Sequence, residues 1–385
     1  MSIVKVGLEV LFQTNEYDEL LTDKRLALIT NPTGVDSNFN SAIDLLNEKF
    51  NLTALFSPEH GVRGDAAAGA LIDSYVDPIT GIPVYSLYRK DSQSLTEDML
   101  DTFDVLIYDL QDLGARYYTY PYSLLNVMED CAKANKTVVV LDRPNPLGGL
   151  EVEGNILETE FKSFVGGYEM ANRYALTIGE FALMANDAKD INVDLHIVKM
   201  DGWERDMLWP DTGLHWVSPS PNIPTFETAL LYPGTCLIEG TNLSEGRGTA
   251  LPFKQVGASF ITDPEALVRE LNKLDIPGVK FRPTHFTPSM SKEEGKLCGG
   301  VEYYVLDYHE FKPLRAGLQV LYKIKELYPD DFEFRSVLPP STNHFISLLT
   351  GSGKVYDGAS LDEVFAVFDL DEPKYKEDKA KYHLY

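Results

Sequence analysis

The 385 residues, 44% of them hydrophobic and 24% charged, have the composition of a soluble globular protein long enough for two domains. The formal net charge of −25 argues against nucleic acids and anionic membranes as partners, because both attract a basic surface. No apolar run approaches the roughly 20 residues that cross a bilayer, and the three cysteines lack disulfide or metal-ligand spacing, so we expect buried free thiols.

The first half of the chain alternates strand and helix patterns. We expect strands at 25–30, 52–56, 83–87, 104–110, 137–141 and 194–200, and helices at 40–50, 96–102 and 121–135. Thr96 is the expected N-cap of its helix. Continuous apolar strands separated by helices predict a parallel sheet covered on both faces.

The second half predicts a smaller α+β domain. Its expected elements are strands at 278–286 and 300–307 and helices at 264–274, 313–327 and 361–368. The tryptophan- and proline-rich stretch before it is typical of a fixed connection. We therefore place an α/β domain at 1–215 and a smaller domain at 216–385.

Polar clusters follow three of the predicted strands. They are 57–65 (SPEHGVRGD), 108–121 (YDLQDLGARYYTYP) and 142–149 (DRPNPLGG). Right-handed crossovers gather the carboxyl ends of parallel strands at one edge of a sheet, where ligands bind in open α/β folds. The three clusters together predict a reaction centre at that edge.

Glu59 is the expected proton donor, since a shielded carboxyl at a strand end can have a pKa raised towards neutrality. The structural alternative is a salt bridge to Arg63 or Arg116. His60 is expected to donate to a sugar hydroxyl or to orient Glu59. No second histidine lies at ligand spacing, so we expect no metal.

Asp109 and Asp112 flank Gln111, and either is a candidate second carboxylate or the cap of the following turn. Arg116 and the tyrosines after it combine a cation with aromatic faces. Such a combination suits the binding of a sugar ring and its carboxylate. The structural alternative is an arginine that simply packs on tyrosine. For Arg143, too, both a ligand-binding and a structural role are open.

Asn145, held between two prolines, is placed to recognise a polar ligand. A second polar group, Glu239, Asn242, Glu245 and Arg247, lies among glycines that allow close backbone approach to a ligand. If this segment folds over the first domain, the active site lies in the cleft between the two, because pockets are common at domain interfaces.

Five ordered motifs resemble the NamZ-type exo-β-N-acetylmuramidases, a glycoside hydrolase family. They are the three strand-end clusters, 219–224 (PSPNIP) and 239–249 (EGTNLSEGRGT), and the resemblance runs from about residue 5 to the C-terminus. It implies a Rossmann-like domain, a smaller C-terminal domain and an active site in the cleft between them. It also implies exo-acting release of terminal N-acetylmuramic acid from the non-reducing end of peptidoglycan fragments, with Glu59 as the catalytic carboxyl.

The candidate residues follow from the motifs and the resemblance together. The candidate catalytic residues are Glu59, Asp112 and Tyr117. The candidate substrate-binding residues are His60, Arg63, Asp109, Gln111, Arg116, Tyr118, Arg143, Asn145, Asn222, Glu239, Asn242 and Arg247. We expect no cofactor, and partners that are peptidoglycan-derived disaccharides or muropeptides.

Muramic acid carries a lactyl carboxylate, so an arginine is expected beside it: Arg63, Arg116, Arg143 or Arg247. Retaining, inverting and substrate-assisted routes are all compatible with the sequence. The N-terminus shows no export signal, which predicts a cytoplasmic chain, although many relatives are exported.

Two other functions compete with hydrolysis. A catalytically inactive peptidoglycan- or muropeptide-binding protein would keep the aromatic pocket and lose the acid, and Glu59 is present. A nucleotide-using enzyme would need a glycine-rich phosphate loop after its first strand, which residues 31–34 (NPTG) do not supply.

Overall fold

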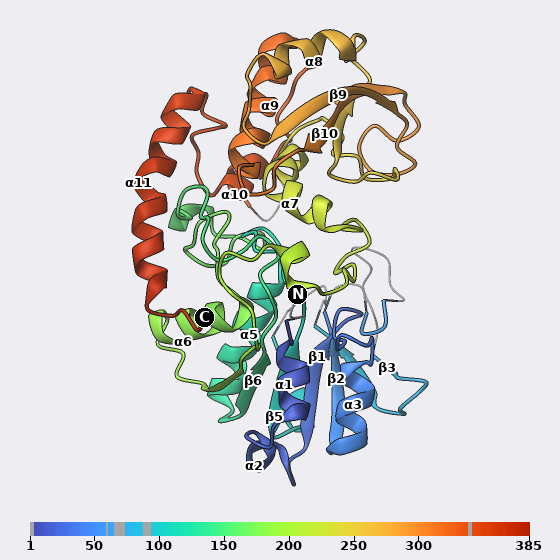
Figure 1. Ribbon diagram of the computed structural model, residues 1–385, viewed down its shortest axis with the longest axis vertical. Coiled ribbons are helices and arrows are strands. Elements are labelled where there is room, and N and C mark those ends of the chain that lie inside the picture. The colour runs from blue at the N-terminus through green and yellow to red at the C-terminus, as the bar shows by residue number, and fades with distance from the viewer. Residues whose placement is uncertain (1–3, 59–60, 65–73, 88–93, 338–340) are drawn as a thin grey trace.

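The computed structural model describes residues 4–58, 61–64, 74–87, 94–337 and 341–385. Two sheets lie towards opposite ends of the elongated molecule (Figure 1). In the described ranges the larger sheet has seven strands in the order β3-β4-β2-β1-β5-β6-β7, all parallel except the edge pair β3 and β4. The predicted α/β fold with a second, smaller α+β part is therefore confirmed.

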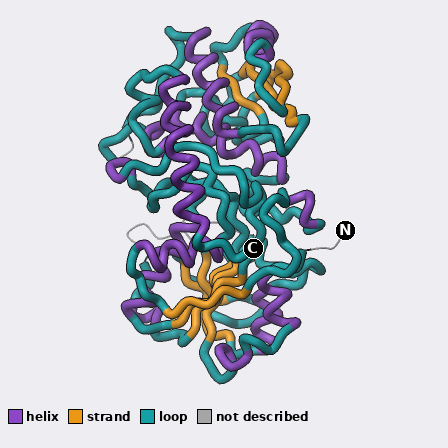
Figure 2. Tube along the Cα trace, turned by 60° about the vertical axis from the view of Figure 1, so that its left-hand side comes forward, coloured by secondary structure: helices purple, strands orange, loops and turns teal. Residues whose placement is uncertain are grey.

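The larger sheet has helices on both faces, as Figure 2 shows. Its strands are β1 (Leu26–Thr30), β2 (Leu52–Ser57), β3 (Tyr75–Val76), β4 (Pro83–Ser86), β5 (Val105–Asp109), β6 (Thr137–Leu141) and β7 (Asp194–Val198). Its helices are α1 (Gly7–Gln13), α2 (Asp18–Leu21), α3 (Ala42–Lys49), α4 (Glu97–Leu100), α5 (Tyr120–Lys133) and α6 (Ile178–Ala188). Thr96 caps α4 as predicted, accepting a hydrogen bond from the Met99 amide.

Alternate residues of each strand enter two separate cores. In β1, Leu28 packs with apolar residues of α1 and α3, whereas Ile29 packs with those of α5 and α6. Successive strand side chains point to opposite faces, so a strand buried on both faces is apolar throughout. This is the pattern from which the sequence predicted a parallel sheet.

The smaller sheet is antiparallel, in the order β8-β10-β9. Its strands are β8 (Gln255–Ala258), β9 (Val279–Phe286) and β10 (Cys298–Val305), accompanied by α7 (Phe226–Thr235), α8 (Pro264–Asn272), α9 (Pro313–Leu327) and α10 (Phe345–Thr350). Short 3₁₀ helices lie at Thr159–Phe161, Trp209–Thr212 and Cys236–Gly240. The structure also contains α1, α2, α6, α7, α10, β3 and β8, which are not among the ranges expected above.

The last helix is much longer than predicted. It was expected to end at residue 368, but α11 spans Leu361–Ala380 and carries the chain back towards the larger sheet (Figure 1). There the Tyr385 hydroxyl donates to Asp142 Oδ2 at 2.8 Å and accepts from the Met200 amide at 2.8 Å. Contacts distant in sequence stabilise the second half of this helix, so its local pattern was uninformative.

The three cysteines are buried and free, as predicted from their spacing. Within the described ranges, no helix combines the length and the apolar character needed to cross a bilayer. The division at residue 216 stays a prediction, and residues 379–385 contact the first half of the chain.

Candidate active site

A cavity with an empty volume of about 900 Å³ lies between the β5–α5 loop and the second half of the chain. Its lining residues are Tyr117, Tyr118, Thr119, Tyr120, Phe164, Val165, Ser220, Asn222, Ile223, Tyr232, Cys236, Glu239, Arg247, Phe253, Arg335, Phe345 and Leu349. We call it the central cavity.

Aromatic rings line part of the central cavity. The ring centroids of Tyr118 and Tyr120 are 4.7 Å apart, and those of Tyr118 and Tyr232 are 6.0 Å apart at an interplanar angle of 90°. Tyr232 also packs edge-on against Phe253 at 4.9 Å. Burial raises the pKa of Tyr118 and Tyr232 well above the ordinary value, so these phenols stay neutral. Such a wall offers apolar faces to a sugar ring.

Charged residues also line the central cavity, namely Glu239, Arg247 and Arg335. Arg247 donates to Glu239 Oε1, from Nη2 at 2.7 Å and Nε at 3.2 Å, and lies 3.3 Å from Glu245 Oε1. Lys292 Nζ lies 2.9 Å from Glu245 Oε2. Burial by itself would lower the pKa of Arg247, but the two carboxylates beside it raise that pKa above the ordinary value. Arg247 is therefore a fixed cation.

Five of the predicted site residues line the central cavity: Tyr117, Tyr118, Asn222, Glu239 and Arg247. They come from three motifs that are distant in sequence, and the fold brings them together. The Tyr117 hydroxyl is already engaged, because it donates to the carbonyl of Pro233 in α7. Burial raises its pKa well above the ordinary value, so the hydroxyl stays protonated.

Arg116 lies outside the cavity, contrary to the expectation that it grips the substrate. Its side chain is completely buried and donates to four backbone carbonyls. These are Asn155 O at 2.8 Å, Met170 O at 2.7 Å, Leu349 O at 3.3 Å and Thr350 O at 2.7 Å. With those acceptors, Arg116 joins the first half of the chain to α10 and offers no access to a ligand.

Asp109 and Arg143 pair with each other. The Arg143 Nε lies 2.5 Å from Asp109 Oδ1, and the Asp109 side chain is completely buried. Asp112 is also enclosed, accepting hydrogen bonds from the Tyr174 hydroxyl and the Gly114 amide. Burial raises the pKa of Asp112 to about 6. Its side chain is buried, and it lines neither this cavity nor the second one described below.

Three predicted amides shape loops instead of lining the central cavity. Gln111 Nε2 donates to the carbonyls of Asp112 at 2.8 Å and Pro144 at 2.7 Å. The Asn145 amide donates to Leu176 O at 2.9 Å and accepts from the Leu147 amide at 2.9 Å. The Asn242 side chain bonds to the backbone at residues 331 and 333 in the same way.

Arg63 is held by two aspartates. Its Nε lies 2.6 Å from Oδ1 of the buried Asp77, and its Nη2 lies 3.4 Å from Asp44 Oδ1. The Arg63 guanidinium holds the pKa of Asp77 well below its usual range. Glu59 and His60 lie outside the described residues, and Ser57 and Gly61 on either side of them are buried.

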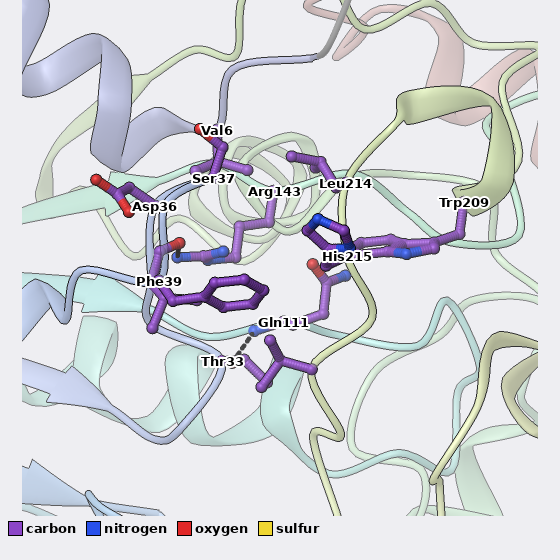
Figure 3. Close-up of a pocket in the computed structure, with 12 residues that line it drawn as sticks. Val6, Thr33, Asp36, Ser37, Phe39, Gln111, Arg143, Trp209, Leu214 and His215 are labelled. Carbon is purple, nitrogen blue, oxygen red and sulfur yellow. Dashed lines mark hydrogen bonds between the residues drawn. The ribbon is translucent and has the colours of Figure 1, made fainter.

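A second cavity, of about 400 Å³, lies at the carboxyl edge of the larger sheet (Figure 3). The loops after β1 and β5 diverge there, which is the switch point of the strand order. Arg143 and Gln111 border it, and the rings of Phe39 and His215 stack with centroids 5.3 Å apart. Nearby, Asn31, the residue after β1, donates to Oη of Tyr120, a residue that lines the central cavity, at 2.9 Å.

Arg335 is a cavity residue that the sequence patterns did not single out. It lies between the predicted helices 313–327 and 361–368, in a segment without a recognised motif. Nothing local indicated that this segment returns to the 239–249 motif. The contact is tertiary: the Arg335 amide donates to the carbonyl of Gly240 at 2.9 Å.

Comparisons with known proteins place this geometry in a family. Residues 26–227 match the model "Exo-beta-N-acetylmuramidase NamZ, N-terminal", and residues 230–385 match the corresponding C-terminal model. The chain is 45% identical over 99% of its length, and 91% of the relative's, to the peptidoglycan beta-N-acetylmuramidase NamZ of Bacillus subtilis strain 168.

Solved structures agree with this match. One DUF1343 family protein of Bacteroides fragilis superposes with a TM-score of 0.89 at 38% identity, covering 99% of both chains. A second from the same organism gives 0.76 at 31% identity, covering 100% of this chain and 99% of its own. With both family models matched along nearly its whole length, the chain belongs to the NamZ exo-β-N-acetylmuramidase family.

Proposed function

We propose that this protein is an exo-β-N-acetylmuramidase, a glycosidase that releases terminal N-acetylmuramic acid from the non-reducing end of peptidoglycan fragments. The observation that carries the proposal is the 45% identity to the Bacillus subtilis enzyme along 99% of this chain. The central cavity supports it, because a lining that combines tyrosine rings with fixed charges suits a polar sugar with an apolar face.

Glycoside hydrolysis needs a proton donor for the leaving oxygen and stabilisation of an oxocarbenium-like transition state. Glu59, two residues beyond the end of β2, is the proposed donor. Glu239 is a carboxylate of the central cavity, and its pairing with Arg247 keeps it oriented to accept hydrogen bonds from sugar hydroxyls. Tyr118 and Tyr232 supply the faces against which the ring packs.

The proposed function is tested with a chromogenic β-N-acetylmuraminide. We expect the wild-type protein to hydrolyse it and Glu59→Gln to lose about 10²–10⁴-fold in kcat, the usual contribution of a general acid. Glu48→Gln, on the exposed surface of α3, is the matched control and should retain wild-type rates.

The same assay separates the alternative functions. Binding of N-acetylmuramic acid without hydrolysis by the wild type would establish the inactive muropeptide-binding protein instead. Hydrolysis with Glu59→Gln within tenfold of wild type would remove Glu59 as the acid and leave the enzymatic activity standing. The anomeric configuration of the first product, followed by NMR, distinguishes retention from inversion.

A further inference from the structure

The charged residues that line the central cavity carry more positive than negative charge. Glu239 supplies one carboxylate, while Arg247 and Arg335 supply two cations. Arg247 pairs with Glu239 and with Glu245, a residue outside the cavity lining that also pairs with Lys292. Within the described residues, Arg335 is therefore the cavity cation left without a carboxylate partner.

The backbone of Arg335 is fixed on both sides. Its amide donates to Gly240 O at 2.9 Å, and its carbonyl lies 3.0 Å from His344 Nδ1. The side chain has only weak contacts by comparison. Nη1 is 3.4 Å from the carbonyl of Glu239, and the guanidinium carbon lies 5.7 Å from the centroid of the Phe345 ring. A fixed backbone with most guanidinium donors uncommitted is the arrangement expected of an anion-binding arginine.

The four arginines that the sequence offered for this role are otherwise engaged. Arg63 and Arg143 are held by buried aspartates, and Arg116 by four backbone carbonyls. Arg247 lines the cavity, but Glu239 already occupies its Nε and Nη2 donors. A substrate carboxylate at Arg247 would displace a protein carboxylate, whereas at Arg335 it would displace none in the described structure.

We propose that Arg335 binds the lactyl carboxylate of N-acetylmuramic acid and thereby sets the preference of the site for muramic acid over glucosamine. This inference rests on the proposed function. A guanidinium can donate two parallel hydrogen bonds to a carboxylate.

The lactyl group also carries a methyl, and Phe345 beside Arg335 stacks on Phe164 with centroids 6.3 Å apart. Phe164 is 58% exposed, so this pair presents apolar surface next to the cation. The arginine and the two rings together match the two chemical parts of the lactyl substituent.

The test compares N-acetylmuramic acid with N-acetylglucosamine, which lacks the lactyl group, by calorimetric titration. We expect the wild type to bind the muramic sugar at least tenfold more tightly. Arg335→Gln should weaken the binding of N-acetylmuramic acid by about 10–100-fold, as expected for a lost charge-assisted hydrogen bond. Its affinity for N-acetylglucosamine should be unchanged. Arg335→Lys should recover part of the loss, and the exposed Arg282→Gln should behave as wild type.

A second substrate isolates the charge. In this substrate, a chromogenic muraminide, the lactyl carboxylate is converted to the amide. The wild type should hydrolyse the amide less well than the acid, mainly through a higher KM. Arg335→Gln should hydrolyse the two substrates equally well. If Arg335→Gln still discriminates the acid from the amide as the wild type does, Arg335 is not the carboxylate ligand, and the proposed function stands. If the wild type neither hydrolyses nor discriminates these sugars, both proposals fail. Thermal unfolding of each variant verifies that it folds.

Discussion

Asp109, the last residue of β5, holds Arg143, two residues beyond β6, in a buried ion pair. Arg143 Nε lies 2.5 Å from Asp109 Oδ1, and Nη2 lies 3.0 Å from Oδ2. A third donor contact joins Arg143 Nη2 to the carbonyl of Val35 at 3.1 Å. The pair ties together three strand-end loops, so two side chains that resemble substrate ligands in the sequence organise the edge of the sheet.

Removing one partner of this pair should destabilise the fold strongly. Arg143→Met leaves the Asp109 carboxylate buried and unpaired, and we expect a loss of about 3–5 kcal/mol in the free energy of unfolding. Urea unfolding measures it. The control Arg282→Met removes the ion pair between the exposed Arg282 and Glu302, and the urea midpoint should stay unchanged. A loss in Arg143→Met no larger than in this control would contradict a structural role for the pair.

Tyr117→Phe distinguishes a structural from a catalytic tyrosine. The hydroxyl donates to the carbonyl of Pro233 in α7, so its removal leaves a buried acceptor unpaired and should cost about 1–3 kcal/mol. We expect kcat on the chromogenic muraminide to stay within tenfold of wild type. A loss of 10²-fold or more at unchanged stability would instead support a catalytic hydroxyl. Tyr304→Phe, on a partly exposed strand residue, is the control.

Lys379 should make stability depend on pH. It is buried in α11, where Nζ donates to Ala175 O at 2.9 Å, and burial, with Arg205 nearby, lowers its pKa to about 7 from 10.5. Between pH 7 and 10.5, Lys379 is therefore protonated in the unfolded chain and neutral in the folded protein. The contribution to stability is therefore present above pH 10.5 and is lost as the pH falls through 7.

Urea unfolding at pH 7 and 8.5 measures this effect. Between these pH values the free energy of unfolding of the wild type should rise by about 1–2 kcal/mol more than that of Lys379→Met. That range lies below the ordinary pKa of the three buried thiols, whose own effect has the opposite sign. The exposed Lys381→Met should show the wild-type dependence on pH. If the free energy of unfolding changes with pH in the same way for wild type and Lys379→Met, this lysine does not cause the pH dependence.

Helices α7 and α9 cross at a pair of glycines. A Cβ on Gly317 would lie 2.4 Å from the Cα of Gly234, so Gly317→Ala must push the two backbones apart. We expect the free energy of unfolding to fall by about 1–3 kcal/mol. We also expect a higher KM, because α7 carries Tyr232 into the central cavity. Gly166→Ala, whose Cβ would come no closer than 3.4 Å to the flexible end of Leu157, should be tolerated. Equal stability of the two variants would contradict this close approach.

Local patterns predicted much of the fold because their physical causes are local. The continuous apolar run of β1, the cap at Thr96 and the apolar face of α5 lie within single segments of the chain. Helix α11 was predicted too short for the opposite reason. Lys379 and Tyr385 are anchored by carbonyls and a carboxylate of the first half of the chain, which no local pattern reveals.

By itself, the sequence determined the α/β class, the order of most elements and the motifs that carry the family resemblance, since all of these are written in neighbouring residues. Tertiary structure alone decided which polar side chains reach the cavity. Arg116 meets the carbonyl of Leu349 across 233 positions of sequence and becomes structural, while Arg335 enters the cavity from a segment without a motif. A buried cation binds whatever acceptors the fold brings to it, and the sequence order does not record those acceptors.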